Sequence, residues 1–159
     1  MGQIRRLVGP VKVGHAGTLD PLASGVLVVG VGREATKRLN DEMLKEKEYE
    51  AVIKLGATST TDDEEGDKSE VTVTAIPTET EIREILKEFI GTISQVPPQF
   101  SAIKIKGKPA YQTARQGGEV TLAARPVHIF DIEFLSYTWP YLSLRVRTGP
   151  GVYIRSLAR

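Results

Sequence analysis

The sequence predicts an α+β fold in which a mixed, mostly antiparallel sheet is flanked by helices. Apolar and polar residues alternate over residues 48–55, 127–137 and 141–147, as they do in strands with one buried face. A short connection that contains Pro140 separates the last two segments, which favours a hairpin and therefore antiparallel pairing. Apolar residues at helical spacing over residues 34–45 predict one of the flanking helices.

The first part of the chain predicts short elements around a polar loop. Residues 4–8 have the character of the last turn of a helix, which the following glycine and proline end. Residues 12–14 predict a short extended piece. Residues 25–31 contain the apolar run V-L-V-V and predict a buried strand, which would brace the loop before it.

The middle of the chain predicts a polar loop, a short strand and a capped helix. Residues 56–68 are rich in threonine and acidic side chains, and residues 71–75 predict a strand. Thr78 and Glu81 have the spacing of a capping box, so we expect a helix from there to Ile90. The predicted core face of this helix consists of Ile82, Ile85, Leu86 and Phe89.

The last third of the chain predicts further short elements around the long hairpin. Residues 101–106 predict a strand that ends in the turn G-K-P. Residues 110–116 predict a short helix, which Gly117 and Gly118 end. From residue 151 onward the chain is expected to turn helical.

The composition is that of an ordinary globular domain, with 159 residues of which 40% are hydrophobic and 26% are charged. The absence of cysteine excludes disulfides, thiolate nucleophiles and cysteine-bound zinc. No apolar run approaches the roughly 20 residues of a membrane span. The N-terminus lacks the apolar segment of a signal peptide. We therefore expect a cytoplasmic protein that does not associate with membranes.

The net charge of +1 is unevenly distributed along the chain. Residues 1–48 carry 8 basic and 6 acidic side chains, residues 49–91 carry 4 and 11, and residues 92–159 carry 9 and 3, so that +2, −7 and +6 sum to +1. A basic last third suits a phosphate-bearing partner, and a solvated strand face would have the same composition. The basic side chains concerned include Lys104, Lys106, Lys108, Arg115, Arg125, Arg145 and Arg147.

Three other patterns are weak indications of a site. Gly30 and Gly32 lie between a predicted strand and a predicted helix, but Ala35 replaces the third glycine of a dinucleotide-binding loop. The acidic run at residues 62–67 lacks the spacing of a calcium-binding loop and is expected to be a solvated turn. The two histidines are far apart in the sequence. We therefore expect no metal and no cofactor.

The stretch G-H-A-G-T-L-D-P-L-A-S-G, residues 14–25, is the strongest candidate for a reactive site. A polar loop held by a rigid strand is a common position for reactive groups, and Asp20 supplies a carboxylate there. Taken alone, an aspartate before a proline is more often a turn former, and a single histidine such as His15 is more often structural. Support comes from Tyr49, in a predicted strand, and from Arg155, where a glycine-led turn enters a helix.

Six segments, in order, resemble the TruB family of tRNA pseudouridine synthases, and they cover nearly the whole chain. The segments are K-V-G-H and the stretch that follows it (12–25), G-R-E-A-T-K (32–37), K-E-Y (47–49), Q-V-P-P-Q-F-S-A (95–102), A-R-P-V (124–127) and G-V-Y-I-R (151–155). The last has Val152 where the family usually has threonine. Six segments in the family's order are far more specific than any one of them.

The resemblance implies the isomerisation of uridine 55 in the T-loop of tRNA to pseudouridine, without a metal or another cofactor. The bond from ribose C1′ to N1 breaks, and the base is rejoined through C5. The resemblance assigns Asp20 as the catalytic carboxylate, Arg155 as the arginine that keeps it ionised, and Tyr49 as the tyrosine stacked on the target uracil. A carboxylate can support positive charge at C1′ or form an adduct there. Whether Asp20 attacks C1′ or C6, or assists removal of the 2′ proton, stays open.

The same resemblance assigns residues that bind the substrate. His15 would displace the extruded uridine and occupy its place, and Tyr153 would line the pocket. Lys37 and the basic segment 104–147 would contact the RNA backbone. The implied partner is the T-stem-loop of tRNA, and no obligatory protein partner is expected.

Compared with the family, residues 1–159 are expected to form an incomplete catalytic domain. We expect the N-terminal K-P-x-G-x-T-S segment and the C-terminal RNA-binding domain of the family to be absent. The missing N-terminal strand would leave a sheet edge open. Two alternatives stay open. The chain could be a non-catalytic RNA-binding fragment, or a relative that acts on another RNA with a guide complex.

Overall fold

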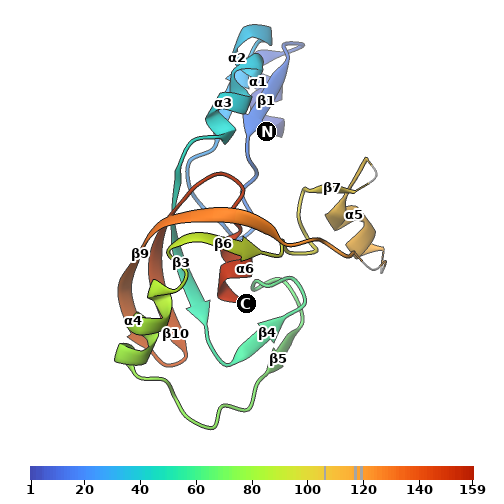
Figure 1. Ribbon diagram of the computed structural model, residues 1–159. Coiled ribbons are helices and arrows are strands. Elements are labelled where there is room, and N and C mark those ends of the chain that lie inside the picture. Colours follow the sequence, from blue (N-terminus) through green and yellow to red (C-terminus); the bar gives the residue numbers. More distant parts are fainter. Residues whose placement is uncertain (106, 117, 119) are drawn as a thin grey trace. The chain divides into compact units, whose positions relative to one another are not determined.

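The computed structural model describes residues 1–105, 107–116, 118 and 120–159 (Figure 1). The chain divides into two compact units, Met1–Glu46 and Lys47–Arg159. Each unit combines antiparallel strands with short helices, which confirms the predicted α+β class.

The first unit is a two-stranded antiparallel sheet with short helices. Strand β1 (Val13–Ala16) pairs with β2 (Val28–Val31), and Gly14 lies opposite Gly30. A Cβ added to Gly30 would lie 3.0 Å from the backbone of Ala35, so the glycine allows close approach of helix and strand. The helices of this unit are α1 (Gly2–Val8), α2 (Arg33–Lys37) and α3 (Leu39–Met43).

Two predictions for the first unit are wrong in part. The strand predicted over residues 25–31 begins only at Val28, because β1 ends at the residue opposite Val28, and Val26 is 90% exposed. The helix predicted over residues 34–45 is divided in two at Arg38. Just before the division, the Thr36 hydroxyl donates a hydrogen bond to the carbonyl of Arg33 at 2.9 Å, a contact that bends helices.

The second unit is built on a four-stranded antiparallel sheet in the order β3-β10-β9-β6. The predicted hairpin is confirmed, because β9 and β10 are antiparallel neighbours. Strand β3 pairs with the other edge of β10, and β6, which the sequence did not predict, pairs with β9. The strands are β3 (Lys47–Lys54), β6 (Gly91–Gln95), β9 (Arg125–Thr138) and β10 (Tyr141–Thr148).

The core of the second unit lies between one face of this sheet and the helices α4 (Glu79–Lys87) and α6 (Ile154–Ala158). Leu142, Leu144 and Val146 alternate along β10 toward the core, where they join Ile129 of β9. Helix α4 (Glu79–Lys87) has the predicted capping box and buries Ile82. Its Ile85 is 56% exposed, contrary to prediction. Ile82 and Leu86 are four residues apart and share the buried face, while Ile85 lies about 100° around the helix from Leu86.

Shorter elements complete the second unit. Strand β4 (Ala57–Ser59) pairs with β5 (Lys68–Glu70), and β7 (Lys104–Ile105) pairs with β8 (Lys108–Pro109). The helices are α5 (Ala110–Arg115), as predicted, and α6 (Ile154–Ala158).

The strand predicted over residues 71–75 is wrong. Strand β5 pairs with β4 only as far as Glu70, which lies opposite Ala57. The next N–H, that of Val71, donates a hydrogen bond to the Gly56 carbonyl at 2.9 Å. The chain turns at Gly56, where φ is 74°, so β4 offers no further strand to pair with. Lys106 and Gly117, the predicted ends of a strand and a helix, lie outside the described residues. None of the described helices has the length and apolar character required to span a bilayer.

Candidate functional site

The loop between β1 and β2 carries Asp20 at an exposed position. As predicted for Asp-Pro, the residue opens a turn, because its carbonyl accepts a hydrogen bond from the Ala23 N–H at 2.9 Å. His15 lies in β1 opposite Val29 of β2, and its Nδ1 donates to the carbonyl of Gly17. One strand and the loop that follows it thus hold both polar residues of the candidate motif.

Lys37 belongs to the same unit and is solvent-accessible. Its Nζ lies 2.8 Å from Oε1 of Glu34 on helix α2, and both side chains are largely exposed. A surface ion pair of this kind contributes little stability, so the ammonium can exchange its carboxylate partner for a phosphate.

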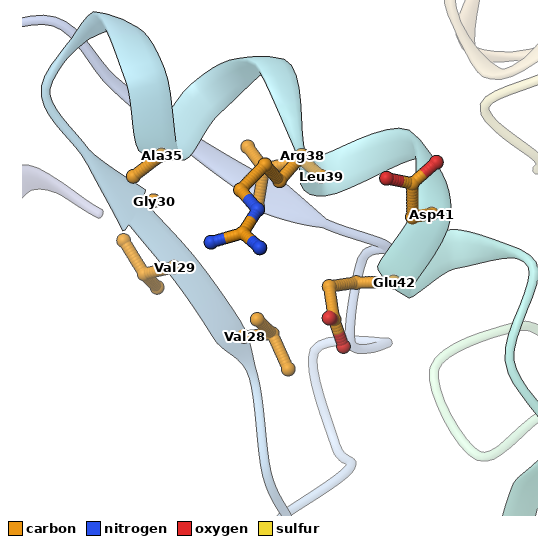
Figure 2. Close-up of a pocket in the computed structure, with 8 residues that line it drawn as sticks. All are labelled: Val28, Val29, Gly30, Ala35, Arg38, Leu39, Asp41 and Glu42. Carbon is orange, nitrogen blue, oxygen red and sulfur yellow. The ribbon is translucent and has the colours of Figure 1, made fainter.

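An open hollow of about 490 Å³ lies between β2 and helices α2 and α3 (Figure 2). Val28 and Val29 line the strand side, and Arg38 extends from the helices toward the strand. The carboxylates of Asp41 and Glu42 belong to the same rim. The lining contains none of the residues that the sequence proposed for the site.

Tyr49, Tyr153 and Arg155 are gathered in the second unit on two elements that touch. Tyr49 lies in β3 opposite Val146 of β10 and is half-buried. Tyr153 precedes helix α6, which contains Arg155, and α6 packs against β3. The fold therefore brings these three residues to two contacting segments of the second unit, although more than 100 residues separate Tyr49 from Tyr153 in the sequence.

Several polar groups hold the Arg155 guanidinium in place. The side chain is 13% exposed, and its Nη1 donates to the Thr61 carbonyl at 3.0 Å and to Oδ2 of Asp63 at 3.3 Å. Its Nη2 donates to the carbonyl of Phe100 at 3.1 Å. A planar guanidinium with acceptors on both nitrogens is fixed in position and direction.

Only part of the acidic loop is the solvated turn that the sequence predicted, because Glu64, Glu65 and Asp67 are exposed and its first two residues are not. The side chains of Asp62 and Asp63 are 17% and 18% exposed, and each pairs with an arginine near the end of the chain. Asp63 pairs with Arg155, while Asp62, at a φ of 58°, pairs with Arg159 at 3.1 Å. No local pattern links residues 92 and 97 positions apart, so the sequence offered no signal for these two pairs.

The long strands do not present a simple basic surface. Arg145 of β10 lies 2.7 Å from Glu50 of β3 and 2.6 Å from Glu133 of β9. Hydrogen bonding to Glu50, followed by the charge of Glu133, raises the pKa of Arg145. Arg147 lies over the ring of Phe130, 5.6 Å from its centre. For Arg145, these ion pairs favour the solvated strand face over a contact with a phosphate-bearing partner.

The structure thus organises the predicted site residues as two sets. Asp20, His15 and Lys37 belong to the first unit, and Tyr49, Tyr153 and Arg155 to the second. Among the residues that the structure describes, no three histidine, aspartate or glutamate side chains form a group able to hold a metal ion.

The sequence matches a family described as TruB family pseudouridylate synthase (N terminal domain) over residues 5–154. A tRNA pseudouridine synthase B of Parabacteroides distasonis is 47% identical over 152 residues, which are 96% of this chain and 64% of that protein. Its namesake in Acaryochloris marina is 43% identical over 163 residues, 100% of this chain and 55% of that protein. The chain spans between about half and two thirds of the length of these relatives.

Solved structures agree with the fold. A Cbf5-Nop10-Gar1 complex contains a chain with a TM-score of 0.68 and 29% identity, over 99% of this chain and 37% of that chain. An H/ACA RNP bound to a substrate RNA containing 2′-deoxyuridine gives a TM-score of 0.65 and 27% identity, over 99% and 35%. These likenesses confirm the predicted pseudouridine synthase fold.

Proposed function

This chain belongs to the TruB family of pseudouridylate synthases, and on that premise we propose that it converts uridine 55 in the T-loop of tRNA to pseudouridine. The observation that carries the proposal is the family match over residues 5–154, which spans Asp20, Tyr49 and Tyr153. In the reaction the C1′–N1 bond breaks and a C1′–C5 bond forms. C5 loses its proton and N1 gains one, so no group leaves the RNA.

In the first unit, Asp20 is the catalytic carboxylate of the proposed reaction. Its exposure on a loop makes it reachable by an extruded nucleotide, and its negative charge can stabilise positive charge at C1′. His15, five residues earlier, offers a flat ring that can occupy the gap left in the base stack. Lys37 supplies a positive charge for the RNA backbone.

In the second unit, Arg155 and two tyrosines are the residues to which the proposal assigns a role. Hydrogen bonds hold the Arg155 guanidinium to Thr61, Asp63 and Phe100. The family resemblance assigns this cation the role of keeping the carboxylate of Asp20 charged. Tyr49 stacks on the uracil, and Tyr153 lines the pocket. In the proposed function, residues 1–159 belong to the catalytic domain, which acts on tRNA in the cytoplasm.

The stand-alone tRNA enzyme is favoured over a guide-dependent relative. The sequence is 43–47% identical to the two tRNA pseudouridine synthases B, and 27–29% identical to the chains from the Cbf5 and H/ACA complexes. The proposal therefore includes no protein partner that is needed to recognise the RNA.

The direct test is tritium release from a T-stem-loop RNA that carries uridine labelled at C5. We expect stoichiometric release with the chain alone, and none from an RNA with cytidine at the target position. Release that appears only with a guide complex would support the guide-dependent alternative. RNA binding without release under either condition would show a non-catalytic fragment and would refute the proposed activity.

A further inference from the structure

We infer that Gln95 and Arg125 form a cradle that positions Tyr153 and the start of helix α6. The two residues lie on neighbouring strands of the second unit and contact residues 151–153. They act through Tyr153 and are therefore positioning residues. The catalytic consequence of the cradle rests on the proposed function, whereas its existence does not.

Gln95 binds the backbone of Tyr153 with both ends of its side-chain amide. Gln95 is 5% exposed, its Nε2 donates to the Tyr153 carbonyl at 3.1 Å, and its Oε1 accepts from the Tyr153 N–H at 2.9 Å. One buried side chain thus pairs with one residue as a neighbouring strand would. Separating them would leave buried polar groups unpaired, which is unfavourable.

Arg125 contacts the same segment at two points. Its Nη2 donates to the Gly151 carbonyl at 2.7 Å, and its Cζ lies 5.5 Å from the centre of the Tyr153 ring. Gly151 has a φ of 81°, and a Cβ there would lie 3.3 Å from Nη2 of Arg125. The guanidinium therefore restrains both the turn and the ring, the latter through a cation–π contact.

The sheet register explains why these two side chains converge. Gln95 is the last residue of β6 and lies directly opposite Arg125, the first residue of β9. Side chains directly opposite each other in an antiparallel pair share one face of the sheet. Both therefore reach residues 151–153 from the same side of the sheet. Gln95 contacts the Tyr153 backbone, and Arg125 contacts the Gly151 carbonyl and the Tyr153 ring.

The cradle links the packed sheet to the candidate site. Tyr153 precedes α6, and its carbonyl also accepts the helical hydrogen bond from the Leu157 N–H at 3.2 Å. Fixing this carbonyl fixes the direction in which α6 begins, and Arg155 is two residues further on. Loss of the cradle should therefore misplace groups of the site without removing any of them.

Amide hydrogen exchange measured by NMR tests the cradle without reference to activity. In Gln95→Met, which keeps the side-chain length and removes both hydrogen bonds, the Tyr153 amide should exchange at least about tenfold faster relative to that of Leu144. Val127→Ala is the matched control, because Val127 is a buried β9 residue opposite Ile93 of β6. The control should leave the ratio unchanged. An unchanged ratio in Gln95→Met would refute the cradle.

Steady-state kinetics on the T-stem-loop RNA test its catalytic consequence. We expect kcat of Gln95→Met to fall about a hundredfold, the effect of misplacing a site by about 1 Å. KM should change less than about twofold. Val127→Ala, compared at a similar loss of Tm, should keep kcat. An equal loss of kcat in both variants would show a merely structural role and overturn the inference. If the native chain has no activity, the proposed function fails, and hydrogen exchange alone decides about the cradle.

Substitution of Arg125 distinguishes the cradle from an RNA contact. Arg125→Ala should lower kcat and leave the RNA Kd and its salt dependence unchanged. Arg125→Lys, which can still donate to the Gly151 carbonyl, should restore part of kcat. Arg83→Ala on α4 removes an equivalent contact, with the ring of Phe134 on β9 at 3.8 Å, and should have no effect on kcat. A weaker Kd with a salt slope reduced by about one, at unchanged kcat, would show a phosphate contact and refute the assignment of Arg125.

Discussion

The two units differ in how their structure is maintained. Within residues 1–46, all of which are described, Leu39 is the one buried hydrophobic side chain. The second unit has a continuous core that includes Ile129, Leu144 and Val146. A two-stranded sheet with helices of five to seven residues has little stability of its own, whereas four strands and a capped helix bury a full face. The carboxylate of the candidate site thus belongs to a thinly supported unit, and the guanidinium to a well-packed one.

Replacing Asp20 should have the largest effect on activity and almost none on stability. Asp20→Asn removes the charge that supports C1′, so we expect activity to fall at least about a thousandfold. Because Asp20 is exposed, the free energy of unfolding should change by less than about 0.5 kcal/mol. Tritium release and urea denaturation measure the two effects, with Asp41→Asn, at an exposed position of α3, as the control. Turnover retained in Asp20→Asn would contradict the assignment.

Replacing Arg155 should affect both activity and stability, in contrast to Asp20. Arg155→Lys keeps a positive charge but cannot supply the planar donors that bind the Thr61 and Phe100 carbonyls and Asp63 together. We expect about a hundredfold loss of activity and about 1–2 kcal/mol of lost stability. The same two assays apply, with the exposed Arg83→Lys as the control. Unchanged stability would show that the hydrogen bonds of Arg155 do not hold the second unit together.

Truncating one apolar side chain in each unit tests the difference in packing directly. Leu144→Ala removes a side chain that is 1% exposed, which should cost about 3 kcal/mol of unfolding free energy. Val26→Ala removes one that is 90% exposed, so the change should stay within about 0.5 kcal/mol. Chemical denaturation measures both. Similar losses in the two variants would contradict the exposure of Val26 and with it the difference in packing.

The smallest effects are expected at the cap of α4. Thr78→Ala should cost about 1 kcal/mol, the usual contribution of such a cap. The Thr78 backbone N–H, followed by its hydroxyl, lowers the pKa of Glu81 below its ordinary 4.5. Because the folded pKa is the lower one, the stabilisation by Glu81 is complete above about pH 4.5 and is lost as the pH falls through the folded pKa.

Glu81→Gln tests the pH dependence of the cap. It should flatten the acid limb of stability against pH, whereas Glu84→Gln, which breaks an exposed pair with Lys87, should not. Denaturation midpoints between about pH 5 and pH 3 provide the measurement. An acid limb that is equally steep in Glu81→Gln would contradict the role of the capping box.

The capped helix and the long hairpin, which have a strong local signal, were predicted correctly, whereas β6, which is defined by a distant partner, was not predicted. The capping box of Thr78 and the alternation that forms β9 and β10 involve neighbours in the sequence. Strand β6 is short and polar, and only its pairing with β9 makes it a strand. Residues 71–75 alternate well but lack a partner, because β4 begins only after the turn at Gly56.

The candidate site shows the same division. The motif around Asp20 and the positions of Tyr49 and Arg155 could be proposed from the sequence through the family resemblance. The pairing of Asp63 with Arg155 could not, because it depends on how a loop returns to a helix 92 residues later. The same is true of Gln95 and Tyr153, which are 58 residues apart and meet only through the sheet register. Contacts of this kind are decided by topology.

The ion pairs of the central strands have a consequence for how the RNA of the proposed reaction would approach the protein. Cross-strand register sets Arg145 between Glu50 and Glu133, and the next arginine, Arg147, between Glu48 and Asp131. Each of these two cross-strand sets holds one positive and two negative charges. The exposed face of β3, β10 and β9 therefore repels phosphate, although the last third of the chain is basic. A diffusing polyanion is steered away from it, and fewer of its collisions are spent on this side of the sheet. In the proposed reaction, the acidic residues of β3 and β9 would thus reduce the frequency of unproductive encounters with the RNA.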